Sequence, residues 1–453
     1  MAHYRFKVEL PTKGEEPPLM TPVESLRRKT IESGVRGNSV NRRTFLQTVG
    51  AGLIASKTKM GQAAAVQVER SPDVVVVGAG AFGIWTALHL QGLGARVTVV
   101  DAYGVGNSRQ TSGGETRGIR TSYGDRPHGR QWVVWARRAI ERWKAWDDEG
   151  SQRLLPKVFF QTGDLILRDE SSQYITDTRS HWDALGVPYE VLTENDIARR
   201  WPWIHYEGLG IALYEPGAGV VRARRAIESV GQVFVDGGGH IEIGRASFGR
   251  RRQAALETVD VSSGGRLSAG SFVFACGPWF PKVFPELMSK RLRISMGHVF
   301  YFAVPPGDTR FVYPNMPSYG VPGCTGWPVL PLDHRGFRVR TGGRPPEDPD
   351  TSDRWVAAEY HERPHEILNR YFPDLAGAAI NETRACHYEA SVDRNFFIDT
   401  HPELDNVWLV GGGSAEGFKF GPVLGEYIAH RVVADDQEPH LADGFRLKAE
   451  QFR

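Results

Sequence analysis

The chain has few cysteines, no long apolar runs and no excess of charge of one sign. Its 453 residues include 3 cysteines, at positions 276, 324 and 386, which is too few and too scattered for a disulfide framework. No run of about 18 apolar residues occurs, which excludes a polytopic membrane protein. Lysine and arginine total 55 against 53 aspartates and glutamates, so the net charge of +2 argues against a large nucleic-acid-binding surface. The composition predicts a soluble protein of more than one domain.

Glycine, by contrast, is abundant. The chain holds 51 glycines among 453 residues, roughly 11% where about 7% is usual. Apolar residues make up 41% and charged residues 24%, as in globular proteins. The glycine clusters therefore become the first places to look for a ligand. The motifs predict no metal site.

The first 70 residues have the features of an export segment. Arg42 and Arg43 are followed by Phe-Leu, then by a mildly apolar run over 49–55 and by three alanines at 63–65. This order is typical of a twin-arginine signal, which exports folded proteins with their cofactors. A basic helix start at the surface is the alternative. We expect 1–70 to be a signal or disordered segment and the mature protein to be periplasmic or extracellular.

The first strong fold signal follows directly. Residues 73–77 read DVVVV, as in a strand buried on both faces, and run into GAGAFG at 78–83. Residues 84–91 have helical spacing, and a second apolar strand over 95–100 ends at Asp101. A strand, glycine turn, helix and strand in this order predict a Rossmann-like dinucleotide-binding unit.

Each position of this unit has a physical role. Gly78 makes the tight turn, Gly80 lets the backbone approach a pyrophosphate, and Gly83 lets the helix pack on the strand. Asp101 is placed to accept hydrogen bonds from a ribose hydroxyl, which disfavours NADP but does not separate NAD from FAD.

Two later regions favour a flavin. Residues 106–120 form a loop of small residues with two arginines, suited to wrapping a large cofactor, although a solvated charge run is the alternative. Near the C-terminus, the apolar strand 407–410 ends in the glycine cluster 411–417 just before a helix. Both ends of the chain would then build one cofactor site. The tryptophans of the helix over 131–148, in contrast, share one face and predict a core stripe.

At this point the chain resembles the monomeric sarcosine oxidase and N-methyl-tryptophan oxidase family, flavoenzymes related to D-amino acid oxidase. The matching pieces are VVVVGAGAFG at 74–83, ETRGIRTSYGD at 115–125, VFACGPW at 273–279, Cys386-His387-Tyr388 with FFID at 396–399, and EGFKFGPVLGE at 416–426. They occur in the family's order from residue 72 to about 435.

The resemblance implies roles for particular residues. Cys386 matches the cysteine that carries FAD covalently, and Arg117 an arginine near the flavin ring. Arg120 and Lys419 match the positions that bind the substrate carboxylate, and Tyr388 a tyrosine of the substrate pocket. The matching motifs add Thr116, Gly413, Gly417 and Lys419 as candidate cofactor contacts. Cys276 is expected to be a core residue, and Cys324 has no predicted role.

The chain departs from the family at three places. Arg338 stands where the family often has a lysine implicated in oxygen activation, so oxidase activity is in question and dehydrogenase activity stays open. A histidine expected near 341–342 is absent. Glu416 stands where the family commonly has histidine, which argues against sarcosine itself as the substrate.

We therefore expect an α/β protein with a discontinuous Rossmann-like FAD-binding domain and a mixed-sheet substrate domain. The first would comprise 72–158, 221–290 and 384–435, and the second 159–220 and 291–383, with strands over 299–304 and 337–340.

The expected activity is FAD-dependent oxidation of a C–N bond in an amino acid or secondary amine, with molecular oxygen as acceptor. The alternatives are an exported amine dehydrogenase using a quinone or protein acceptor, or a flavin-binding protein without catalysis.

Overall fold

The computed structural model describes residues 72–169, 171–206, 208–331 and 334–452. The predicted export segment, residues 1–70, lies outside these described residues. Within the described ranges, no helix combines the length and apolar character that a membrane crossing requires.

A six-stranded sheet contains the first apolar strand. Its order is β21 (Phe397–His401), β22 (Leu404–Gly411), β15 (Ser271–Phe274), β1 (Val74–Val77), β2 (Val97–Asp101) and β9 (His240–Ile243). Neighbouring strands run parallel except at the edge, where β21 is antiparallel to β22. This arrangement confirms the predicted Rossmann-like α/β class.

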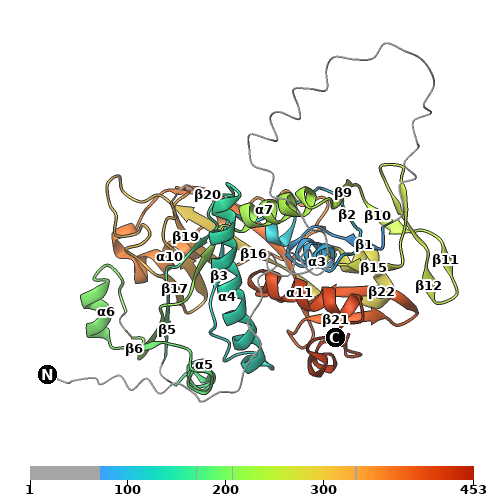
Figure 1. Cartoon of the computed structure of the whole chain (residues 1–453). Helices are drawn as coiled ribbons and strands as arrows, with labels where there is room; N and C mark the ends of the chain where they lie inside the picture. Colours follow the sequence, from blue (N-terminus) through green and yellow to red (C-terminus); the bar gives the residue numbers. More distant parts are fainter. Residues whose placement is uncertain (1–71, 170, 207, 332–333, 453) are drawn as a thin grey trace, which may run out of the picture. The chain divides into compact units, whose positions relative to one another are not determined.

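All four valines of β1 are buried because both faces of the sheet are covered. Val74 and Val76 belong to a core shared with helices α3 (Ala81–Gly92), α7 (Ala223–Asp236) and α11 (Gly421–Val432). Val75 and Val77 face a small sheet of β10 (Ala246–Phe248), β13 (Thr258–Val261) and β14 (Arg266–Ser268). Figure 1 shows α3 beside α11, two helices from opposite ends of the described chain that contact each other.

The long helix α4 (Gly129–Gln152) carries the predicted tryptophan stripe. Trp132, Trp135 and Trp143 are buried in the same core as α3 and α11, and Trp146 packs against it. The core interpretation of this stripe is therefore confirmed.

The second large sheet is a mixed sheet of eight strands. Its order is β20 (Ile380–Ser391), β16 (Leu292–Phe302), β19 (Phe337–Gly342), β18 (Cys324–Trp327), β17 (Ser318–Val321), β5 (Asp164–Arg168), β7 (Ile211–Glu215) and β6 (Glu190–Leu192). Only β17 and β5 pair in parallel. Helix α10 (Glu362–Tyr371) packs beside β19, α6 (Glu194–Arg200) packs beside β6, and α5 (Gln173–Leu185) contacts α4 (Figure 1).

The two large sheets draw their strands from different segments of the chain, which meet at β20. Every strand of the six-stranded sheet falls within 72–158, 221–290 or 384–435. β20, however, crosses the predicted boundary at residue 384 and pairs along its length with β16 of the other sheet. Cys386 and Tyr388 therefore lie on the eight-stranded sheet. The loop over 106–120 ends in β3 (Arg117–Ile119), which pairs with β8 (Gly219–Val221) beside β4 (Phe159–Phe160).

Candidate active site

The turn between β1 and α3 accepts only glycine at two positions. Gly78 has φ +106°, and a Cβ there would lie 2.4 Å from the carbonyl oxygen of Ala275. A Cβ on Gly83 would lie 1.8 Å from the carbonyl oxygen of Gly78. Gly80 lines a cavity at the N-terminus of α3. The turn thus presents bare backbone and a helix N-terminus, as pyrophosphate binding requires.

Asp101 is held at the end of β2 by four donors. Its carboxylate accepts hydrogen bonds from the backbone N–H groups of Ala79 at 2.8 Å and Tyr103 at 2.9 Å, from Gln110 Nε2 at 3.1 Å and from Asn107 Nδ2 at 3.4 Å. Burial raises its pKa, and these hydrogen bonds oppose the rise. Among the described residues, the buried Oε1 of Gln110 has no hydrogen-bond partner. The carboxylate therefore lines the cavity in a fixed orientation, as the ribose prediction requires.

The cavity at this turn, here called the outer cavity, has a volume of about 460 Å³. Asp350 is one of the lining residues, and its carboxylate accepts hydrogen bonds from Tyr103 Oη at 2.7 Å, Trp279 Nε1 at 2.8 Å and Arg245 Nη2 at 2.9 Å, and pairs with Lys282. The outer cavity is also lined by Gly413, Gly417, Arg117, Tyr388 and Phe418. The Asp350 cluster was not predicted, because its members are far apart in sequence and belong to no local motif.

A second, inner cavity of about 150 Å³ adjoins the first. Both are lined by Thr111, Arg117, Tyr388, Ala415 and Phe418. The inner cavity is also lined by the predicted residues Arg120, Lys419, Arg338 and Cys386. Its size suits a small ligand, since pockets for drug-sized molecules run from about 300 to 1,000 Å³.

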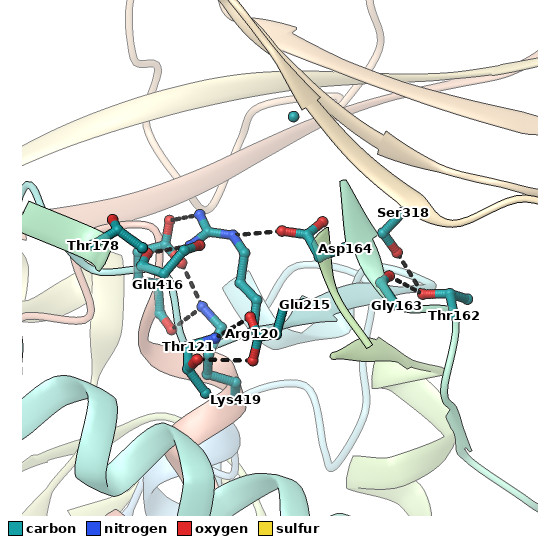
Figure 2. A network of polar contacts seen from close by, with 12 residues as sticks. Arg120, Thr121, Thr162, Gly163, Asp164, Thr178, Glu215, Ser318, Glu416 and Lys419 are labelled. Atoms are coloured by element: carbon teal, nitrogen blue, oxygen red, sulfur yellow. Dashed lines mark hydrogen bonds and ion pairs between the residues drawn. The ribbon is translucent and has the colours of Figure 1, made fainter. Parts of the chain in front are cut away.

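Glu416 is the centre of the polar network in the inner cavity (Figure 2). Its Oε1 lies 3.2 Å from Arg120 Nη2 and 3.9 Å from Arg126 Nη2, and its Oε2 pairs with Lys419 Nζ. Burial favours the neutral acid, but the charges of Arg120, Lys419 and Arg126 outweigh it and hold the pKa of Glu416 well below its usual range. Burial lowers the pKa of Lys419 to about 8, against the attraction of Glu416. The structure thus brings Arg120 and Lys419 together, already paired with an acid of the chain.

Two further carboxylates stand beside this network. Asp164 Oδ2 lies 4.0 Å from Arg120 Nε. Glu215 accepts hydrogen bonds from the backbone N–H of Thr121 at 3.0 Å and from its hydroxyl at 2.8 Å (Figure 2), while burial raises the pKa of Glu215 to about 7. Sequence reasoning missed both. The signal for Asp164 is that it opens strand β5, directly before three apolar residues.

Cys386 lies on β20 opposite Gly297 of β16. Because glycine has no side chain, the facing position on β16 places no side chain beside Cys386. Its Sγ is 3.8 Å from Arg117 Nη2. Burial raises the pKa of the thiol, but nearby arginines, with Arg117 the strongest, outweigh burial and lower it. A lowered thiol pKa marks a nucleophilic cysteine.

The other two cysteines differ from Cys386. Cys276 packs against the core around β1 and β15, as predicted, and also lines the outer cavity; burial raises the pKa of its thiol. Cys324 is buried in β18 within the apolar core of the eight-stranded sheet, and burial raises the pKa of its thiol to about 11. Neither is suited to nucleophilic chemistry at neutral pH.

Arg338 is stacked on Trp327, with its guanidinium carbon 3.6 Å from the ring centre and the residue 2% exposed. The buried Nε of Arg338 has no hydrogen-bond partner among the described residues, and burial lowers the pKa of Arg338 to about 10. Thr116 contacts the same tryptophan. Its hydroxyl accepts a hydrogen bond from Trp327 Nε1 at 3.0 Å and lies 3.2 Å from the hydroxyl of Tyr301. Thr116 lines neither cavity, and neither does Gly83, which packs α3 on β1. The other predicted cofactor contacts each line at least one of the two cavities.

Residues 73–431 match the family described as FAD dependent oxidoreductase (DAO). The chain belongs to this family. It is 25% identical over 400 residues to the monomeric sarcosine oxidase of Arthrobacter sp. (strain TE1826), covering 83% of this chain and 96% of that one. It is 26% identical over 390 residues to the N-methyl-L-tryptophan oxidase of Yersinia pestis (strain Pestoides F), covering 83% and 98%. The crystal structure of glycine oxidase from Geobacillus kaustophilus has the same fold, with a TM-score of 0.70 at 19% identity over 84% of this chain and 99% of that one.

The outer cavity of this DAO-family oxidoreductase fits the FAD that the family binds. The glycine turn leaves the space a diphosphate needs, Asp101 lines the cavity, and Gln110 Oε1 has no partner within the described part of the chain. Gly78, Gly80, Asp101, Gly413 and Gly417 would contact the cofactor. The shared wall of Arg117 and Tyr388 would bring its reactive end to the inner cavity.

Proposed function

We propose that this FAD-dependent oxidoreductase oxidises a C–N bond of an amino acid or secondary amine in the inner cavity. The observation that carries the proposal is the wall common to the two cavities, which puts a small charged pocket directly against the cofactor space. The amine loses two electrons and two protons to give an imine, which water hydrolyses to a carbonyl compound and an amine. Bound FAD supplies the two-electron acceptance.

The chain's own residues bind and orient the substrate. Arg120, Lys419 and Tyr388 surround the inner cavity, and Phe418 borders both cavities. Because the pocket is small, a bound amine has few orientations, and such positioning is worth several kcal/mol of the barrier. The guanidinium of Arg117 at the common wall favours negative charge that develops there.

The first experiment tests turnover without an electron acceptor. The flavin-loaded protein is mixed anaerobically with secondary amines, and the visible absorbance of the flavin is followed. Bleaching by an amine supports the proposal, and the two electrons per imine give its stoichiometry. A flavin that no amine bleaches favours the flavin-binding protein without catalysis.

We propose molecular oxygen as the acceptor, which takes both electrons and two protons to give hydrogen peroxide. The dehydrogenase alternative is kept because Arg338, unlike a lysine, does not release a proton at neutral pH. Peroxide formed under air in step with amine loss supports the oxidase. Turnover that needs an artificial quinone acceptor supports the dehydrogenase.

We propose that FAD is linked covalently to Cys386. The support is the lowered pKa of this thiol and its place on the wall of the inner cavity next to Arg117. After acid precipitation, we expect the yellow colour in the pellet of the unmodified protein and in the supernatant of Cys386→Ala. Flavin released from the unmodified protein would refute the link.

We also propose export through a twin-arginine signal at Arg42 and Arg43, on the sequence pattern alone. The test is fractionation of expressing cells. We expect the mature protein outside the cytoplasm, and Arg42→Lys with Arg43→Lys should retain it inside. An unchanged distribution would contradict export by this route.

A further inference from the structure

We infer that Glu416 takes the place of a substrate carboxylate, so that the substrate is an amine with no carboxylate beside the reacting nitrogen. This inference rests on the proposed function and narrows the substrate class of the same cavity. Its basis is that the chain itself already pairs the two cations expected to bind such a group.

The carboxylate of Glu416 is bound as a ligand would be. Oε1 faces Arg120 at 3.2 Å and Oε2 pairs with Lys419, so each oxygen has its own cation (Figure 2). Arg126 adds a third charge at 3.9 Å. The Lys419 side chain is 4% exposed and that of Glu416 20% exposed, so water screens this arrangement only weakly.

The other side-chain nitrogens of Arg120 also face groups of the chain. Its Nη1 donates to the carbonyl of Ser122 at 3.0 Å and to its hydroxyl at 3.2 Å, and its Nε faces Asp164 at 4.0 Å. The ring of Tyr123 lies under both cations, 5.6 Å from the Arg120 guanidinium and 5.2 Å from Lys419 Nζ. The two-pronged grip that binds a carboxylate uses two neighbouring N–H groups, and Arg120 already directs Nη1 at Ser122 and Nη2 at Glu416.

A free carboxylate competes poorly with Glu416. Glu416 precedes the short helix η5 (Gly417–Phe420) and pairs with Lys419 three residues along the chain, so its binding loses no translational freedom. A ligand pays an estimated 4 kcal/mol or more for that loss. A carboxylate that entered without displacing Glu416 would add a negative charge beside Glu416 and Asp164.

The other arginines of the cavity do not form a substitute clamp. Arg168 donates to the carbonyls of Leu167 at 2.7 Å and Gly320 at 2.8 Å. Arg117, Arg340 and Arg384 lie near the thiol of Cys386, where the flavin is proposed to attach. Arg338 is stacked on Trp327. At the end of the cavity around Arg120, Glu416 and Asp164 face the cations Arg120 and Lys419, and Asp125 lies 3.8 Å from Arg126, so the positive charge that a substrate carboxylate would need is offset by acids of the chain.

The test compares matched substrate pairs on the flavin-loaded protein. The pairs are sarcosine with dimethylamine and N-methylphenylalanine with N-methylphenethylamine, which differ only by the carboxylate. Anaerobic flavin reduction gives kcat/KM without involving an acceptor. We expect the unmodified protein to prefer each carboxylate-free amine by about tenfold or more, the value of one charge-assisted hydrogen bond. Glu416→Gln should reverse the preference, and the exposed control Glu366→Gln should not change it.

A binding measurement complements the kinetics. Acetate is titrated while the flavin absorbance and the melting temperature are followed. We expect Glu416→Gln to bind acetate about tenfold or more tightly than the unmodified protein. Glu416→His replaces Glu416→Gln if the latter does not fold.

The outcomes separate the two proposals. If no amine reduces the flavin, the proposed function fails, and the acetate titration still decides the inference. Acetate binding of equal strength with and without Glu416 overturns the inference. So does a preference of the unmodified protein for the carboxylate-bearing member of each pair, or a preference that Glu416→Gln leaves unchanged.

Discussion

The ion pairs of Glu416 make a quantitative prediction about stability. At an effective dielectric constant of 20, charges separated by the 3.2 Å between Glu416 and Arg120 attract by about 5 kcal/mol before desolvation. Removing one partner of a buried pair costs about 3–5 kcal/mol, because the other charge is left uncompensated. We expect Glu416→Gln to fall in this range, since it strips Arg120, Arg126 and Lys419 of their common counter-ion.

Lys419→Met should be less costly, because Glu416 keeps Arg120. The double variant should be more stable than the sum of the two losses predicts, by about 2 kcal/mol. The assay is urea unfolding of the flavin-loaded proteins at pH 7, followed by tryptophan fluorescence at one flavin concentration. The exposed pair Arg363–Glu366, at 2.9 Å, is the matched control and should show a coupling below about 0.5 kcal/mol.

The lowered pKa of Glu416 determines in which direction pH changes the stability. The folded pKa of Glu416 lies below its ordinary value of 4.5, so its contribution to stability is complete above about pH 4.5 and is lost as the pH falls through the folded pKa. Losses that add within 0.5 kcal/mol at pH 7 would refute the reasoning, since they would mean that Glu416 and Lys419 do not interact.

Four further predictions follow from the site. Gly83→Ala should abolish flavin binding, measured by absorbance of the purified protein, because its Cβ would lie 1.8 Å from the carbonyl oxygen of Gly78; normal loading would contradict the close packing. Cys386→Ser should retain flavin that acid then releases, and colour left in the pellet would exclude Cys386 as the link. Arg338→Lys should raise the rate at which oxygen reoxidises the reduced flavin, in stopped-flow traces; an unchanged rate removes residue 338 as the determinant. The pH profile of flavin reduction should show a step near pH 8, where Lys419 loses its proton, and the step should be absent in Lys419→Met.

Local patterns predicted the cofactor side of the fold well. The valine run, the glycine turn and the second strand lie within 30 residues and form β1, α3 and β2 as expected. Their roles are encoded locally, because the turn needs glycine for reasons of backbone geometry. The tryptophan stripe of α4 was predictable for the same reason, since helical spacing alone assigns its face.

The substrate side depended on contacts between distant segments. Nothing near Asp350 in the sequence shows that four side chains from residues 103–282 converge on it. The departure at Glu416 was visible in the sequence, but its pairing with Arg120 joins residues 296 positions apart. Residue identity raised the right question there, and only the tertiary structure shows which charges the acid meets.

Asp350 connects the cofactor cavity to both large sheets. Asp350 follows β19 of the eight-stranded sheet, yet it lines the outer cavity and accepts hydrogen bonds from Tyr103, which follows β2, and from Trp279, which follows β15. The loop after β19 is therefore joined to the ends of two strands of the six-stranded sheet, beside the space proposed for FAD. Local unfolding of this loop would alter the wall of that space, and hydrogen exchange of the segment around Asp350 would follow it.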